Sequence, residues 1–236
     1  MPQCVRLDRQ LLLVYLGVAG WACRNAPGPE PLLPVGAQPV SRPQVLAWVD
    51  STRIHGHQLY RFKWLFRDER GSAGGRGSAR IAPPDSLRFD VAGPFGSGAA
   101  SAVVVGDQAL WMQPPDAIAK LVPNYPLMWA MFGITQEPPD QAVLSGISND
   151  RLLAWQYAGP TDTVIYALSS GDSRRLVAEV HQSGSLIGRA ETTFKPDGVP
   201  LKSRLTVPSG PAQLDLTFLS TEQASFAPEI WLPRKH

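Results

Sequence analysis

The chain has 236 residues, of which 44% are hydrophobic, so it is long and apolar enough to bury a core of its own. Its formal net charge is only +2 and its arginines and aspartates are scattered, a pattern that argues against nucleic acid as a partner. The only cysteines are Cys4 and Cys23, so we expect the rest of the chain to fold without a disulfide.

Residues 1–22 have the pattern of a secretory signal peptide. Arg6 and Arg9 precede an apolar run at residues 11–19, which is too short to span a bilayer, and a Gly-Trp-Ala triplet then leads to Cys23. Cys23 stands where a bacterial lipoprotein signal has its lipidated cysteine, so we expect a lipid there. Ordinary cleavage by signal peptidase just before Cys23 is the alternative.

Residues 23–43 are rich in proline, glycine and alanine, which favours extended and poorly ordered backbone. This segment is predicted to be a linker that holds a folded domain, residues 44–236, away from a membrane; an unselected disordered tail is the alternative. A helix is predicted to begin near Arg42 or Pro43 and to run to Val49, because Ser41 suits its N-cap and proline suits its first turn.

Most of the remaining chain predicts short β-strands. Residues 59–67 alternate most clearly, with Tyr60, Phe62, Trp64 and Phe66 on one face and basic residues on the other. Residues 71–77 read as a Gly/Ser loop. Further strands are predicted at residues 76–81, 86–91, 99–105, 109–112, 152–158, 164–168, 175–181, 186–194, 201–207 and 213–219.

About ten or eleven short strands therefore predict a mainly β domain with a single antiparallel sheet, which must curl to bury one face. A helical segment at residues 115–133 interrupts the strands, and prolines divide it. Large apolar residues are concentrated in and near it: Trp111, Met112, Leu121, Leu127, Met128, Trp129, Met131 and Phe132. They are expected either to complete a packed core or to line a cavity for an apolar ligand under a helical lid, and methionine suits surfaces that re-pack around a ligand.

The search for catalytic and metal-binding patterns is negative. Gly171-Asp172-Ser173 resembles the nucleophile block of a GDSL-type esterase, but it lies in a predicted turn and no Asp-x-x-His follows it. His55 and His57 lie close together, but the other two histidines are far from them in the sequence, and zinc needs three or four ligands. We therefore expect a protein that is not an enzyme and that has no metal or other cofactor.

The predicted turn at residues 93–98 presents Phe95 between a proline and a glycine. Turns of this kind lie on the surface, so the phenylalanine is hard to bury. It is expected either to form an exposed aromatic tip that enters a bilayer or a partner, or to fold back over the mouth of the sheet.

Three of these segments together resemble the LolA/LolB family of periplasmic lipoprotein carriers, and most of all its outer-membrane branch, LolB. They are the aromatic strand at residues 59–66, the strand at residues 87–91 that leads into Gly-Pro-Phe-Gly, and the apolar helix at residues 126–133. The resemblance covers roughly residues 44–219 and is one of pattern more than of a rigid motif.

The resemblance implies an unclosed antiparallel half-barrel, lidded by helices, whose apolar cavity holds the acyl chains of lipoproteins or lipids. It implies a monomer at the outer membrane facing the periplasm, anchored through Cys23 and served by a LolA-like carrier, with Phe95 as a membrane-probing residue. The expected cavity and lid residues are Tyr60, Phe62, Trp64, Phe66, Phe89, Trp111, Met112, Leu127, Trp129, Met131, Phe132 and Trp155. The alternative is a lipoprotein that transfers nothing and serves as an envelope scaffold or protein-interaction module.

Overall fold

The computed structural model describes residues 32–93, 98–114, 124–171 and 173–233. The strands are β1 (Gln38–Pro39), β2 (Gln58–Asp68), β3 (Gly71–Ala82), β4 (Ser86–Ala92), β5 (Ala99–Val105), β6 (Gln108–Gln113), β7 (Val143–Ser148), β8 (Leu152–Ala158), β9 (Asp162–Ser169), β10 (Arg175–Gln182), β11 (Ser185–Phe194), β12 (Pro200–Val207) and β13 (Ala212–Gln223). The helical elements are α1 (Arg42–Asp50), α3 (Tyr125–Ala130) and the 3₁₀ turn η2 (Pro228–Trp231).

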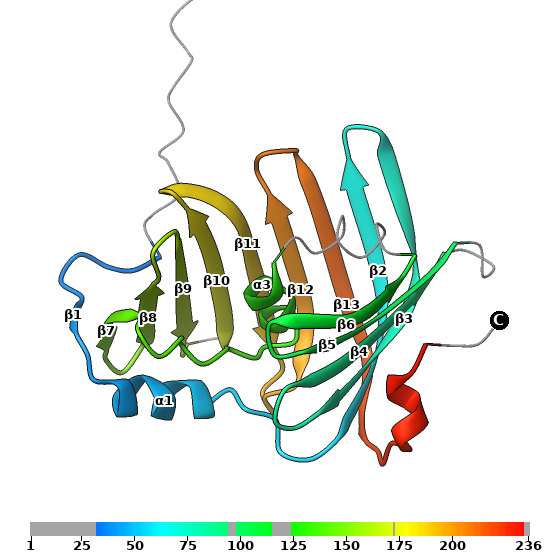
Figure 1. The fold of residues 1–236 in the computed structure, drawn as a ribbon, viewed down its shortest axis with the longest axis horizontal. Coiled ribbons are helices and arrows are strands. Elements are labelled where there is room, and N and C mark those ends of the chain that lie inside the picture. The colour runs from blue at the N-terminus through cyan, green and yellow to red at the C-terminus, as the bar shows by residue number, and fades with distance from the viewer. Residues whose placement is uncertain (1–31, 94–97, 115–123, 172, 234–236) are drawn as a thin grey trace, which may run out of the picture. The chain divides into compact units, whose positions relative to one another are not determined.

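All thirteen strands belong to one sheet, in the order β1-β7-β8-β9-β10-β11-β12-β13-β2-β3-β4-β5-β6. Neighbouring strands are antiparallel, including the pair of β2 with β13 that joins the first strands to the last. The sheet curls strongly, but its edge strands β1 and β6 do not pair, so it remains an unclosed half-barrel (Figure 1). The predicted fold class, a single antiparallel sheet that is not closed into a barrel, is confirmed.

The predicted loop at residues 71–77 is wrong, because these residues form the first half of β3. Two of the glycines that suggested a loop, Gly75 and Gly77, are required by close packing instead. A Cβ on Gly77 would lie 2.4 Å from Cε2 of Phe62, and one on Gly75 would lie 1.9 Å from the carbonyl oxygen of Ala92. These positions of β3 therefore have no room for a side chain, although the backbone pairs normally with β2.

Two strands were not predicted. β1 lies within the segment expected to be a linker, where Gln38 and Pro39 pair with Gly146 and Ser145 of β7. In β7 the glycine again marks close packing, since a Cβ on Gly146 would lie 2.7 Å from the ring of Trp48. These two strands extend the sheet to thirteen, beyond the ten or eleven expected.

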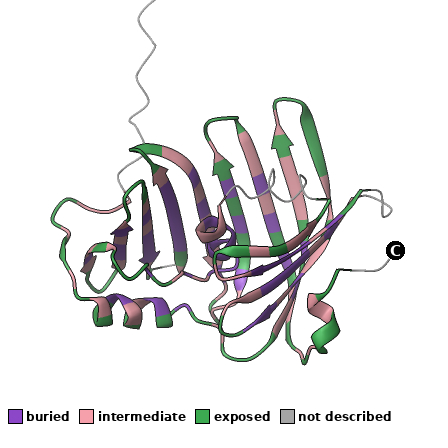
Figure 2. Cartoon of the chain, viewed as in Figure 1, coloured by how far each residue is buried: buried purple, intermediate pink, exposed green. Residues whose placement is uncertain are grey.

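The helix predicted near Arg42 is confirmed as α1, which buries Val45 and Val49. α3 corresponds to the second half of the predicted helical segment and packs against β10 and β11 inside the curl of the sheet (Figure 1). Buried residues recur along the strands and in α3 (Figure 2). Among the described residues, no helix has the length and apolar character needed to cross a membrane.

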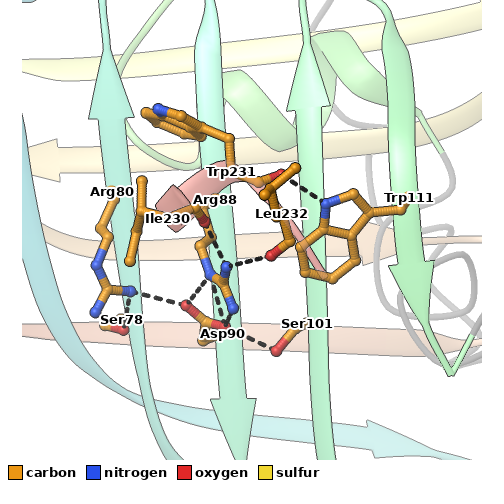
Figure 3. Close-up of polar contacts among 9 residues, drawn as sticks. All are labelled: Ser78, Arg80, Arg88, Asp90, Ser101, Trp111, Ile230, Trp231 and Leu232. Atoms are coloured by element: carbon orange, nitrogen blue, oxygen red, sulfur yellow. Dashed lines mark hydrogen bonds and ion pairs between the residues drawn. The ribbon is translucent and has the colours of Figure 1, made fainter. Parts of the chain in front are cut away.

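A buried ion-pair cluster lies on the outer, convex face of the sheet (Figure 3). Arg88 of β4 is only 2% exposed, and its Nε donates to Asp90 at 2.9 Å. Asp90 also accepts hydrogen bonds from Arg80 at 2.8 Å and from the hydroxyl of Ser101 at 2.7 Å. The cluster therefore ties β3, β4 and β5 together through side chains as well as through their backbone ladder.

The C-terminal η2 covers this cluster (Figure 3). Arg88 donates to the carbonyl oxygen of Ile230, and Trp111 Nε1 donates to the carbonyl oxygen of Trp231 at 2.8 Å. The guanidinium of Arg88 also lies 5.2 Å from the centroid of the Trp111 ring. The chain end is thus held against the outside of β4 and β6.

The Asp90 cluster predicts how stability depends on pH. Burial raises the pKa of Asp90, but hydrogen bonds from Arg88 and Ser101 and the charges of Arg88 and Arg80 lower it by more, so the net pKa lies below its ordinary value. The ionised carboxylate therefore stabilises the fold above about pH 4, and this contribution is lost as the pH falls through the lowered pKa.

We expect Asp90→Asn to lower the free energy of unfolding by about 3 kcal/mol at pH 7, because Arg88 would remain buried without its counter-charge. Urea unfolding should find a smaller difference from the wild type at pH 3. Asp150→Asn, a change at an exposed residue of the β7–β8 turn, should have no such effect. Equal stability of Asp90→Asn and wild type at pH 7 would contradict this account.

Candidate functional site

The interior of the half-barrel is filled by an aromatic cluster. The ring of Phe132, just after α3, lies with its centroid 5.8 Å from Tyr60, 6.2 Å from Phe89 and 6.0 Å from Phe218. Phe62 stacks on Phe89 at 5.5 Å. All five side chains are at most 5% exposed, so the concave face forms a packed core around α3.

Buried hydroxyl groups hold the C-terminal end of α3. The hydroxyl of Thr192 on β11 donates to the carbonyl oxygen of Ala130 at 2.7 Å, and that of Ser203 on β12 donates to the carbonyl oxygen of Met131. At the other side of the helix, Trp129 Nε1 donates to the carbonyl oxygen of Gly106 at 2.8 Å. These three hydrogen bonds fix α3 to β11, to β12 and to the turn between β5 and β6.

Open space lies beside α3. A cavity of about 810 Å³, called here the α3 cavity, is bounded by the end of α1, by α3 and by the residues that follow it. The turns β3–β4, β5–β6 and β8–β9 complete its wall. The β8–β9 turn lies at the opposite end of the sheet from the other two, so it is the curl of the sheet that brings the three turns to one cavity.

The α3 cavity has an apolar floor and a polar rim. The floor is made by buried side chains of strands and helices: Val49, Ile81, Trp129, Tyr157, Val164 and Val180. The rim is made by exposed residues that follow α1 and α3 or lie in the turns, among them Arg53, Asp107, Glu137 and Asp162. This division suits a ligand with one apolar part and one polar part.

The phenol of Tyr157 lies at the floor of the α3 cavity, and that of Tyr166 is buried beneath it. Burial raises the pKa of Tyr157 to about 12; a hydrogen bond from Tyr166 lowers it in part, and the charge of Asp107 raises it. Burial also raises the pKa of Tyr166, whose hydroxyl accepts a hydrogen bond from the backbone N–H of Gln136 at 3.3 Å. Both phenols are therefore neutral at physiological pH and serve as hydrogen-bonding groups.

The predicted cavity residues occupy several different places. Of the set, only Trp129 lines the α3 cavity. The other buried members lie in the core: Tyr60, Phe62, Phe89, Leu127, Met131, Phe132 and Trp155. Trp64, Phe66 and Met112 are partly buried and pack against that core. Cys23 and Phe95 lie outside the described residues.

The placement of Trp111 on the cavity wall is wrong. A β-bulge shifts the pairing of β5 with β6, so that Trp111 lies opposite Val103, which itself pairs with Arg88. Directly paired residues share a face of the sheet, and Trp111 therefore lies on the convex face with Arg88. Simple alternation along β6 could not reveal the bulge.

Sequence reasoning missed most of the α3 cavity. Its wall includes Asp85, Asp107 and Asp162, which lie in turns or at a strand end, and Ile134, which follows α3. Short motifs such as Gly-Asp and Gly-Pro indicate a turn but not where that turn lies relative to the others. Among the described residues, no group of three His, Cys, Asp or Glu side chains is placed to hold a metal ion.

Comparisons with known proteins identify the fold. No protein-family model matches the sequence, and no curated protein matches it. A LolA superfamily protein from Nitrosomonas europaea superposes with a TM-score of 0.53 at 11% identity, covering 82% of this chain and 98% of that one. The chain has a LolA-like fold. A domain named as an outer membrane lipoprotein-sorting protein domain, from Vibrio parahaemolyticus, superposes on this LolA-like chain with a TM-score of 0.52 at 10% identity, over 80% and 94% of the two chains.

The attachment of α3 can be tested through its buried hydroxyl partners. Thr192→Val keeps the shape of the side chain but removes the hydroxyl that donates to the carbonyl oxygen of Ala130. That oxygen would keep only the backbone N–H of Gly133 as a donor, so we expect the variant to lower the free energy of unfolding by about 1 kcal/mol. Urea unfolding measures this change. Thr206→Val, at an exposed position of β12, is the matched control. If the two variants are equally stable, α3 is not held as described.

Proposed function

We propose that the protein binds the acyl chain of a lipid or lipoprotein in the α3 cavity and acts as a carrier in the bacterial envelope. The observation that carries this proposal is the cavity itself, which has about 810 Å³, an apolar floor and a polar rim within a LolA-like fold. That volume is typical of sites that enclose small molecules. The two solved LolA-like structures support a role in lipoprotein handling by analogy of fold alone.

The energetics suit a carrier that must release its ligand. Each methylene removed from water gains about 0.8 kcal/mol, so a chain of about a dozen carbons gains on the order of 10 kcal/mol when fully buried. A cavity open at its rim buries such a chain only in part and so retains it less tightly. Transfer then proceeds without a nucleotide when the acceptor binds the chain better than the carrier does.

The finer form of the proposal follows the LolB resemblance. In it, the protein receives lipoproteins from a LolA-like carrier and delivers them to the outer membrane, anchored there by a lipid on Cys23. Phe95 enters the bilayer during delivery. Both residues belong to this proposal because of the sequence pattern around them, and both lie outside the described residues.

A second candidate function is favoured by the packed aromatic core. Because Phe62, Phe132 and Phe218 fill the interior, the sheet can also serve as a rigid envelope scaffold for protein contacts, without any transfer of ligand. The two functions differ in one measurable property, which is the binding of an alkyl chain.

Blocking the α3 cavity should weaken the binding of an alkyl chain. Ile54 lines the cavity and is partly exposed, so Ile54→Trp should fill the mouth, spare the fold and weaken the binding of decyl maltoside at least tenfold. Titration calorimetry below the micelle concentration measures the affinity. Val143→Trp, at a 72% exposed position of β7, is the matched control. A wild-type protein that binds no alkyl probe would support the scaffold instead.

The role proposed for Phe95 predicts a defect in delivery without a defect in folding. Phe95→Glu should slow the transfer of a labelled lipopeptide to vesicles, because a charged side chain is costly to insert into a bilayer. Phe95→Leu should preserve transfer, since it keeps an apolar tip. Normal transfer by the Phe95→Glu variant, with circular dichroism showing both variants folded, would contradict the role.

A further inference from the structure

The charges around the α3 cavity are unbalanced. Five charged residues line it, and Arg53 is the only cation among them. Arg53 forms ion pairs with Glu137 at 2.7 Å and with Asp50 at 3.4 Å, so its charge is already compensated. The other three carboxylates, those of Asp85, Asp107 and Asp162, form no ion pair within the described parts of the chain. Among the residues that the structure describes, the rim therefore carries three carboxylates that no ion pair compensates.

This negative charge reaches the floor of the cavity. Burial is the main cause of the raised pKa of Tyr157, and the charge of Asp107 raises it further because it disfavours a second negative charge nearby. The same field that opposes a phenolate at this position favours a cation. The same negative charge would repel an anionic group.

A second feature also favours a ligand that can donate hydrogen bonds. Asn124 lines the cavity, and its Oδ1 atom is buried without a hydrogen-bond partner among the described residues. Asn124 is the N-cap residue of α3, yet its side chain makes no capping hydrogen bond. A buried acceptor without a donor is costly, so an N–H group supplied by a ligand would relieve that cost.

We propose, on the basis of the binding function above, that the α3 cavity selects amphiphiles that carry a protonated amine next to the apolar chain. The chain would lie on the floor near Trp129 and Val164, and the ammonium group would lie at the rim among Asp85, Asp107 and Asp162. One N–H of the ammonium would donate to Asn124 Oδ1. Ligands with an anionic head group would be disfavoured by the same carboxylates.

Four probes with the same ten-carbon chain separate the parts of this proposal. They are decylammonium, decyltrimethylammonium, decyl maltoside and decyl sulfate, each titrated calorimetrically into the purified protein below its micelle concentration. We expect decylammonium to bind most tightly, decyltrimethylammonium next because it lacks N–H donors, and decyl sulfate at least tenfold more weakly than decylammonium. Added salt should reduce these differences, because the rim is exposed.

Variants assign the selectivity to named residues. Each exposed carboxylate, at roughly 7 Å from the ammonium group in water, contributes about two- to threefold in affinity. Asp107→Asn with Asp162→Asn should therefore weaken decylammonium about four- to ninefold and leave decyl maltoside unchanged. Asp150→Asn, an equal charge change at the opposite end of β8, should alter neither. Asn124→Leu should remove the preference for decylammonium over decyltrimethylammonium.

The outcomes distinguish this inference from the function on which it rests. Equal binding of all four probes would overturn the selectivity and leave the acyl-binding function in place. Failure of every probe to bind would overturn both. Selectivity that persists in the variant with both rim aspartates replaced would overturn the role given to the rim.

A competition experiment separates two natural sources of such a ligand. Lysophosphatidylethanolamine carries its amine on a lipid, and an acylated peptide with a free amino terminus carries it on a polypeptide. Displacement of decylammonium by either compound supports the proposal and identifies the source. Displacement by neither contradicts it.

Discussion

An open sheet that curls without closing must have its concave apolar face covered, and α3 provides the cover. The helix inserts into the curl with Leu127 in the core, and Met131 and Phe132 follow it there, so the aromatic side chains meet one another rather than a ligand. The helix ends inside the protein, and carbonyl oxygens at its end accept hydrogen bonds from the sheet as well as from the backbone that follows. Thr192 and Ser203 donate the hydrogen bonds from the sheet, on two neighbouring strands, and so help to fix the end of α3 against the concave face.

The position of α3 also determines where a ligand can bind. With the centre of the half-barrel filled, the remaining space lies where α1, α3 and three turns meet. Strands and helices supply the buried floor of this α3 cavity, whereas mainly the turns and the residues after the helices supply its charged rim. Affinity for a chain and selectivity for a head group therefore come from different parts of the fold. On the outer face, Arg88 and Asp90 hold β4 to its neighbours and to η2.

Strand alternation predicted the fold well but could not predict the site. The contrast between aromatic and basic residues in β2 requires one buried face, which the structure confirms for Tyr60 and Phe62. Glycine was misread in β3, since a missing side chain at Gly77 reflects contact with a ring and not a turn. Trp111 was misplaced because a bulge reverses the expected face. The rim aspartates come together only through the curl of the sheet, a property that no local pattern contains.

The proposed function requires that an alkyl chain occupy the α3 cavity while α3 stays in place. Photo-crosslinking with a decyl maltoside analogue that carries a diazirine at the end of its chain tests this directly, with peptide mass spectrometry to locate the label. We expect the label to be found on the cavity floor, in the segments that contain Trp129, Tyr157 and Val164. Labelling centred on Phe62, Phe89 and Phe218 would contradict it, because the chain would then have displaced α3 and entered the packed core.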